Sequence, residues 1–308
     1  MTDTPERCSD SARERVDPMV GTASPSRRWL LIEHPGPWAV AALDSPGIPA
    51  ARQALQAAVV AGAGRVQLIR RPGRQSSEGP YLWVVLDHDT GRRASGTWRQ
   101  GPEDTPDAGL LEAAQALAAT APAPGAGQPP DDPLLLVCAH GRHDVCCAVR
   151  GRPVAAALAQ RWPDLTWECS HVGGDRFAAN LVVVPDGVYY GQLDAVSAVD
   201  VVAAHLAGRV DVEHLRGFTT VPAAAQAAMT EAHRRWGPAG PRGFVPTSVT
   251  PTDEGRWNVE LAGGAGLPHT VTATVARSLL APARLTCRAT HEASPVAFDV
   301  TDLQVLEA

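Results

Sequence analysis

The chain has 308 residues, and all 27 of its cationic side chains are arginine, so it contains no lysine. This absence excludes mechanisms that need a lysine amine, among them the P-loop NTPases, the pyridoxal phosphate enzymes and the protein kinases. With 33 acidic side chains the net charge is −6, and there is no arginine-rich block, so no nucleic-acid partner is expected. No apolar run is long enough to span a bilayer, so no membrane partner is expected either.

Residues 1–25 are expected to be a disordered lead-in. The segment is charged and lacks the apolar region of a signal peptide. A cytoplasmic protein is therefore expected, in which cysteines serve as reduced thiols or metal ligands rather than as structural disulfides.

Residues 26–120 have the pattern of a first lobe of helices and strands. Strands are predicted over residues 28–33, 65–69, 81–87 and 94–98, and helices over 48–62 and 108–119. A run of alanine, proline and glycine without periodicity then predicts a linker over residues 121–132.

Residues 133–218 repeat the same order. Strands are predicted over 133–137, 165–168, 181–184 and 188–192, and helices over 152–162 and 195–207, the first opened by Arg152-Pro153. The order strand, loop, helix, strand, antiparallel hairpin, helix is that of a thioredoxin-like sandwich. The sequence thus predicts an α/β (α+β) fold with two thioredoxin-like lobes.

Residues 219–308 are predicted to form a small C-terminal α+β appendage. One helix over 223–236 is followed by alternating strands near residues 243–249, 256–262, 270–276, 283–289 and 296–300. No residue pattern in this appendage indicates chemistry.

Cysteine and histidine gather in the second lobe. Four of the six cysteines lie between positions 138 and 169, together with nearby histidines: Cys138, Cys146, Cys147, Cys169, His140, His143 and His171. The other two cysteines, Cys8 in the lead-in and Cys287 in a predicted strand, are interpreted as incidental.

Two loops are expected to bring these donors together. Cys138 follows a buried strand directly, at the carboxyl end where open α/β sheets place their active loops. Cys147 ends the loop that begins there, and His171 follows the next strand. Zinc sites usually pair ligands two to four residues apart, which does not fit this spacing, so an iron–sulfur cluster is favoured over zinc.

These residues carry a resemblance to a known family. The run VCAHGRHDVCCAVRGRP, followed by WECSHVGGDRFAANLVVVPDGVYYGQLD, resembles the sucrase/ferredoxin-like family of thioredoxin-like [2Fe–2S] proteins. The shared pattern is Cys-x8-Cys followed by His-x-Gly-Gly-His. The close match covers about residues 133–193, and the loop WLLIEHPGPW of the first lobe is also similar.

The resemblance implies that Cys138 and Cys147 hold one iron and that His171 holds the other. Where the family has its second histidine, this chain has Asp175. The fourth ligand is therefore open: Asp175 is favoured by position, Cys169 is the runner-up and Cys146 comes third. A carboxylate or thiolate in place of imidazole would lower the reduction potential.

The neighbouring residues are expected to support the site. His140 and His143 are interpreted as stabilising the loop or facing solvent, and Asp144 as its cap or brace. Four arginines, Arg142, Arg150, Arg152 and Arg176, either stabilise an anionic cluster, receive an acidic partner or are ordinary surface residues.

The leading hypothesis is a [2Fe–2S] electron carrier rather than a stand-alone enzyme. Because no flavin or nicotinamide motif is present, its electrons must come from a redox partner protein, which the sequence does not identify. The alternatives are a thiol–disulfide oxidoreductase using Cys146 and Cys147, and a structural zinc module. The sequence predicts no oligomeric state.

Overall fold

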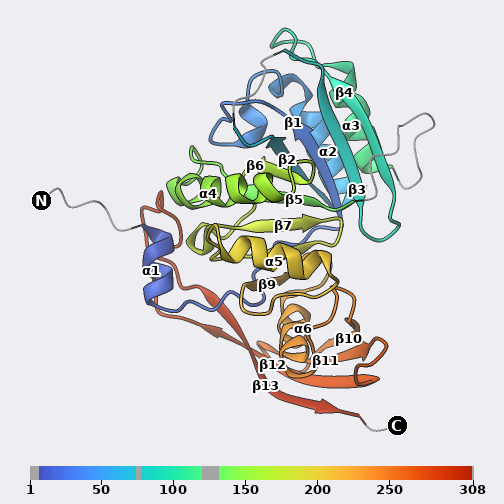
Figure 1. Cartoon of the computed structure of the whole chain (residues 1–308), viewed down its shortest axis with the longest axis vertical. Helices are drawn as coiled ribbons and strands as arrows, with labels where there is room; N and C mark the ends of the chain where they lie inside the picture. The colour runs from blue at the N-terminus through green and yellow to red at the C-terminus, as the bar shows by residue number, and fades with distance from the viewer. Residues whose placement is uncertain (1–6, 74–77, 120–131, 307–308) are drawn as a thin grey trace, which may run out of the picture. The chain divides into compact units, whose positions relative to one another are not determined.

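The computed structural model describes residues 7–73, 78–119 and 132–306 (Figure 1). The chain divides into two compact units. The first, here called the sheet unit, comprises Ser26–Val172 and Leu181–Gly187. The second, the terminal unit, comprises Met1–Pro25, Gly173–Asn180 and Val188–Ala308.

The sheet unit is built on seven strands in the order β4-β3-β1-β2-β6-β5-β7. They are β1 (Arg28–Glu33), β2 (Gly64–Arg70), β3 (Tyr81–Asp87), β4 (Arg93–Trp98), β5 (Leu134–Cys138), β6 (Thr166–Cys169) and β7 (Leu181–Val184). The pairs β1–β2 and β5–β6 are parallel, and the other neighbours are antiparallel. The mixed α/β class predicted from the sequence is confirmed.

Helices and short turns cover this sheet. The helices are α2 (Arg52–Gly62), α3 (Ala108–Ala118) and α4 (Val145–Arg161), with 3-10 turns η1 (Ala42–Asp44) and η2 (Pro49–Ala51). Alternate residues of the first-lobe strands point toward α2 and α3, so Leu30, Ile32, Trp83 and Val85 share one core with Leu55 and Leu117.

The strands of the two predicted lobes belong to one continuous sheet. Strand β2 of the first lobe pairs with β6 of the second, with Ile69 opposite Cys169 and Arg70 opposite Glu168. Arg70 and Glu168 also form an ion pair of 2.7 Å across this junction. The expected linker over residues 121–132 lies outside the described residues except for Asp132, and the domain boundaries stay predictions.

One helix begins earlier than predicted. Helix α4 begins at Val145 and contains Pro153, whereas the sequence pattern placed its start at Arg152-Pro153. The reason is Asp144, whose carboxylate accepts a hydrogen bond of 2.8 Å from the Cys146 backbone N–H and so caps the helix. As a result Cys147 lies in the first turn of α4 and not in the preceding loop.

The terminal unit holds the remaining elements. They are α1 (Cys8–Glu14), η3 (Asp175–Phe177), β8 (Val188–Tyr190), α5 (Ser197–Leu206), β9 (Leu215–Phe218), α6 (Ala223–Trp236), β10 (Phe244–Pro251), β11 (Arg256–Gly263), β12 (Thr270–Leu279) and β13 (Val296–Val305). Strands β10 to β13 form an antiparallel sheet in chain order, and α6 packs on it (Figure 1). This is the predicted C-terminal helix and strand pattern.

Two expectations about this unit are wrong. The predicted disordered lead-in contains helix α1, which buries Cys8 and Ala12. The sequence did not indicate this helix, because seven residues are too few to show a helical period. Residues 283–289 are not a strand, because the chain between β12 and β13 forms only an isolated bridge of Ala283 with Ala293. Residues 1–6 of the lead-in lie outside the described residues.

No helix in the described part of the chain combines the length and the apolar character needed to cross a membrane.

Candidate metal centre

Three of the predicted ligands meet within the sheet unit. The sulfur atoms of Cys138 and Cys147 and a ring nitrogen of His171 all lie within 4.8 Å of one another. Cys138 ends strand β5, Cys147 lies in the first turn of α4, and His171 follows β6. Both cysteines are fully buried, whereas His171 is half-buried. The structure therefore forms a buried group of soft donors that can hold a metal ion.

A glycine allows α4 to approach Cys138 closely. A Cβ atom added at Gly151 would overlap the backbone carbonyl oxygen of Cys138. Because Gly151 has no side chain, the helix packs directly on the end of β5. This close packing holds Cys147 on α4 next to Cys138.

His140 connects the loop of His171 to the first lobe. Its Nδ1 accepts a hydrogen bond of 3.3 Å from the His171 backbone N–H, so its Nε2 carries the proton and donates to the carbonyl of Ala39 at 2.7 Å. Burial lowers the pKa of His140 to about 4, in agreement with this neutral tautomer. The expectation that His140 stabilises the loop is borne out by these contacts.

His143 lies against the predicted ligand His171. Their rings stack with centroids 3.7 Å apart and an interplanar angle of 22°. The Nδ1 atom of His143 is 3.3 Å from the carbonyl oxygen of Val40, which comes from the same first-lobe loop that contacts His140. This stacking limits the rotation of the His171 ring.

Strand β2 also positions His171, which sequence reasoning did not find. Gln67 Nε2 donates to the His171 carbonyl at 3.3 Å, and Gln67 Oε1 accepts a hydrogen bond of 2.7 Å from Ser170. The Oγ atom of Ser170 in turn accepts a hydrogen bond from the backbone N–H of Leu68. The sequence shows only a polar glutamine within a predicted strand, and this does not by itself indicate a partner 104 positions away.

The electrostatics of the site favour a thiolate at Cys138. A hydrogen bond from Cys147 lowers the pKa of Cys138 to about 5, with help from His171 and against the effect of burial. Burial raises the pKa of Cys169 well above its usual value, and the nearby Cys138 adds to the increase. At neutral pH Cys138 is thus in the form that binds metals, and Cys169 is a neutral thiol.

Asp175, the predicted fourth ligand, belongs to the terminal unit. It is buried in the 3-10 turn η3, which follows Gly173 and Gly174 at φ values of 94° and 76°. The buried Arg216 donates to the Gly173 carbonyl at 2.9 Å and to Asn180 Oδ1 at 2.8 Å. The glycine loop therefore has a fixed conformation within its own unit.

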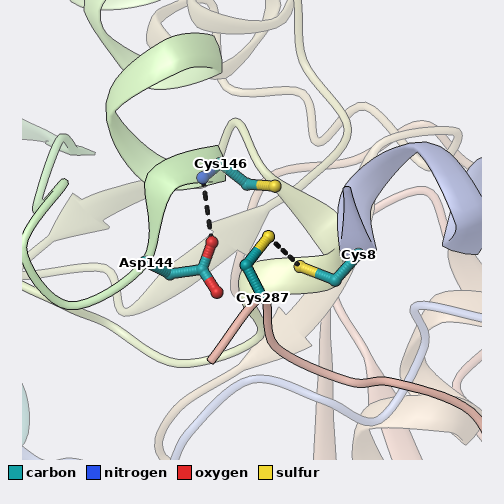
Figure 2. Close-up of side chains that lie close together, drawn as sticks. All are labelled: Cys8, Asp144, Cys146 and Cys287. Carbon is teal, nitrogen blue, oxygen red and sulfur yellow. Dashed lines mark hydrogen bonds between the residues drawn. The ribbon is translucent and has the colours of Figure 1, made fainter. Parts of the chain in front are cut away.

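The remaining residues named from the sequence are one cysteine and four arginines. Cys146 is buried, and its backbone N–H meets the Asp144 cap (Figure 2). Arg142 and Arg152 are exposed, and Arg150 is half-buried. In the terminal unit Arg176 pairs with Asp17 at 3.4 Å.

Two cysteines interpreted as incidental are neighbours in the terminal unit. Figure 2 shows that the side chains of Cys8 and Cys287 point toward each other, and their sulfur atoms are 3.5 Å apart. The two residues are 279 positions apart, so their proximity arises only in the folded chain.

Comparison with known proteins gives one result. The model of the sucrase/ferredoxin-like family matches residues 19–217, which include the cysteine pair, His171 and the first-lobe loop that contacts their neighbours. No curated protein and no solved structure matches the chain.

Proposed function

Because the chain belongs to the sucrase/ferredoxin-like family, we propose that it is an electron carrier that holds a [2Fe–2S] cluster. In this proposal Cys138 and Cys147 bind one iron, and His171 and Asp175 bind the other.

The observation that carries the proposal is the convergence of Cys138, Cys147 and His171. Their ligand atoms come from three elements of the sheet unit and lie within 4.8 Å of one another. Thiolate and imidazole are the ligands that iron–sulfur clusters use. The lowered pKa of Cys138, at about 5, further supports metal binding, since the thiolate is available without the cost of removing a proton at neutral pH.

The chain's own residues would prepare this site before a cluster arrives. Gly151 allows α4 to place Cys147 next to Cys138. His140 accepts a hydrogen bond from the backbone N–H of His171, and Gln67 donates one to its carbonyl oxygen. The ring of His143 stacks on the ring of His171. A [2Fe–2S] cluster bound there would accept and release single electrons.

Asp175 is proposed as the fourth ligand on the strength of its position in the family pattern. The buried turn that carries it is fixed by Arg216 and Asn180. Cys169 is less suitable, because burial raises its pKa and favours the neutral thiol over the metal-binding thiolate. A carboxylate keeps a negative charge on the cluster and would give a lower potential than a second histidine.

In this proposal another protein supplies the electrons that reduce the cluster. Three arginines near the cysteine loop, Arg142, Arg150 and Arg152, provide cationic contacts for an acidic redox partner.

Purification of the full chain without oxygen tests the proposal. The expected product is brown, with visible charge-transfer bands and equal amounts of iron and acid-labile sulfide. Cys138→Ser and Cys147→Ser should each lose the colour and the sulfide, whereas Cys287→Ser, which removes a thiol outside the ligand set, should keep both.

A colourless, sulfide-free wild-type protein would refute the iron–sulfur assignment. Stoichiometric zinc in that protein would then identify a zinc module. A metal-free protein that catalyses thiol–disulfide exchange would support the oxidoreductase alternative.

A further inference from the structure

We infer that Cys8 and Cys287 form a redox-active thiol pair, which a low-molecular-weight disulfide carrying carboxylates oxidises reversibly to an intramolecular disulfide. The sulfur atoms of the two residues are 3.5 Å apart, and a disulfide needs about 2.0 Å. The side chains already point at each other, so a small movement of either sulfur closes the bond (Figure 2).

The pair joins two segments that are 279 positions apart in the chain. Cys8 begins helix α1, where it is only 2% exposed, and the salt bridge of Arg15 with Asp17 at 2.9 Å lies at the other end of that helix. Cys287 lies in the connection between β12 and β13, which reaches α1 (Figure 1). A disulfide would fasten the N-terminal helix to this hairpin.

Among its described residues, the connection that carries Cys287 contains one isolated β-bridge and no regular strand. The bridge between Ala283 and Ala293 closes it with backbone hydrogen bonds of 3.1 and 3.0 Å. Beyond that bridge, the Arg284 guanidinium donates to the Cys287 carbonyl at 2.6 Å. Cys287 is half-buried, so it is the more accessible sulfur of the pair.

A cavity of about 170 Å³ beside the pair gives a reagent access. It is lined by Cys8, Ser11, Arg15, Pro282, Ala283, Arg284 and Glu292. Two of these side chains, Arg15 and Arg284, are cations; Arg15 is paired with Asp17, and Glu292 adds one carboxylate to the lining. The Arg284 guanidinium can receive a carboxylate of a small thiol compound, and Cys8 lies in the wall of the cavity.

The chemistry is thiol–disulfide exchange in two steps. The Cys287 thiolate attacks one sulfur of the reagent disulfide; the reagent S–S bond breaks, a mixed disulfide forms, and the first small thiolate leaves and takes a proton. The Cys8 thiolate then attacks the Cys287 sulfur and releases the second small thiol. The two protein thiols lose two electrons and two protons in total, and the reagent gains both.

The test uses the full chain and glutathione disulfide as the probe. Reduced protein is treated with the probe, remaining thiols are alkylated, and peptides are mapped by mass spectrometry. We expect a peptide pair joined through Cys8 and Cys287, lost on treatment with dithiothreitol. Mapping at the peptide level separates this pair from any oxidation of Cys138 or Cys147.

Single variants report on the two steps separately. Cys8→Ser should stop at one glutathione on Cys287, because the resolving thiol is missing. The double variant Cys8→Ser, Cys287→Ser should carry no modification at either position. In the wild type the oxidised form should unfold at a higher temperature than the reduced form, and the double variant should show no such shift.

Two results would overturn the inference. One is that Cys8 and Cys287 both remain fully alkylatable after exposure to the probe. The other is that either residue is recovered in a disulfide with a different cysteine of the chain.

Discussion

The backbone N–H of His171 donates a hydrogen bond of 3.3 Å to Nδ1 of His140, whose other ring nitrogen donates to the Ala39 carbonyl at 2.7 Å. A single neutral imidazole thus joins the loop of a proposed ligand to the loop after β1. The His171 backbone position depends on this connection.

His140→Ala should lower the free energy of unfolding by about 2 kcal/mol, because two hydrogen bonds of a buried side chain are lost at about 1 kcal/mol each. Iron content per chain should fall as well, since the His171 loop loses its attachment. Chemical denaturation and metal analysis measure the two effects. His269→Ala is the control, because His269 is exposed in the terminal unit; an equal effect of both variants would contradict the role given to His140.

Gly151→Ala tests the close contact of α4 with β5. The new methyl group would overlap the Cys138 carbonyl oxygen, so the helix must move and the variant should be less stable by about 1–3 kcal/mol. The spacing of Cys138 and Cys147 should change too, with loss of bound iron. Gly101→Ala is the matched control, because a Cβ at Gly101 meets no atom within 4 Å. Urea denaturation that gives the same midpoint for both variants would refute the packing argument.

Asp175→Ala and Cys169→Ala separate the candidates for the fourth ligand. If Asp175 binds iron, its loss removes a negative charge, so the reduction potential should rise and the EPR spectrum of the reduced protein should change. Cys169→Ala should leave the potential and the spectrum as they are, because the Cys169 thiol has a raised pKa. Redox titration followed by EPR measures both, and the opposite pattern would assign the ligand to Cys169.

The stability of the protein should fall as the pH falls from about 6.5 to 4. Burial lowers the pKa of His233 from 6.5 to about 4, and neither ring nitrogen has a hydrogen-bond partner among the described residues. Between these values the unfolded chain binds a proton that the folded chain does not. This stabilisation is therefore complete above pH 6.5 and decreases toward pH 4, by at most about 1.4 kcal/mol per pH unit.

His233→Phe isolates this contribution. The ring of His233 lies between Phe218 and Phe244, with centroids 6.0 and 5.2 Å away, so an aromatic replacement suits the site. The variant should lose less stability than the wild type between pH 7 and pH 5, as measured by denaturant titration. His34 and His140, whose pKa values are also lowered by burial, stay in both proteins and do not affect the difference. Parallel pH profiles for the two proteins would show that His233 does not contribute.

The sequence by itself determined the α/β class, most of the strands and the positions of three donors. Local patterns were enough for these, because strand periodicity appears in consecutive residues, Cys138 and His171 each follow a predicted strand, and Cys147 lies between the first of these strands and the next helix. The missing lysine likewise excluded whole classes of chemistry without any structure. The predicted start of α4 is wrong. Arg152-Pro153 has the pattern of a first helical turn, but the helix begins earlier, directly after the capping residue Asp144.

Only the tertiary structure decided which distant residues meet. His140 reaches Ala39, Gln67 reaches His171, and Cys8 lies against Cys287, in each case across more than 100 positions of chain. No local pattern encodes such contacts, because they arise from the pairing of strands and the packing of helices rather than from neighbouring residues. Gly151 shows the same limit: its sequence context gives no hint that the space of its missing side chain is taken by the carbonyl of Cys138.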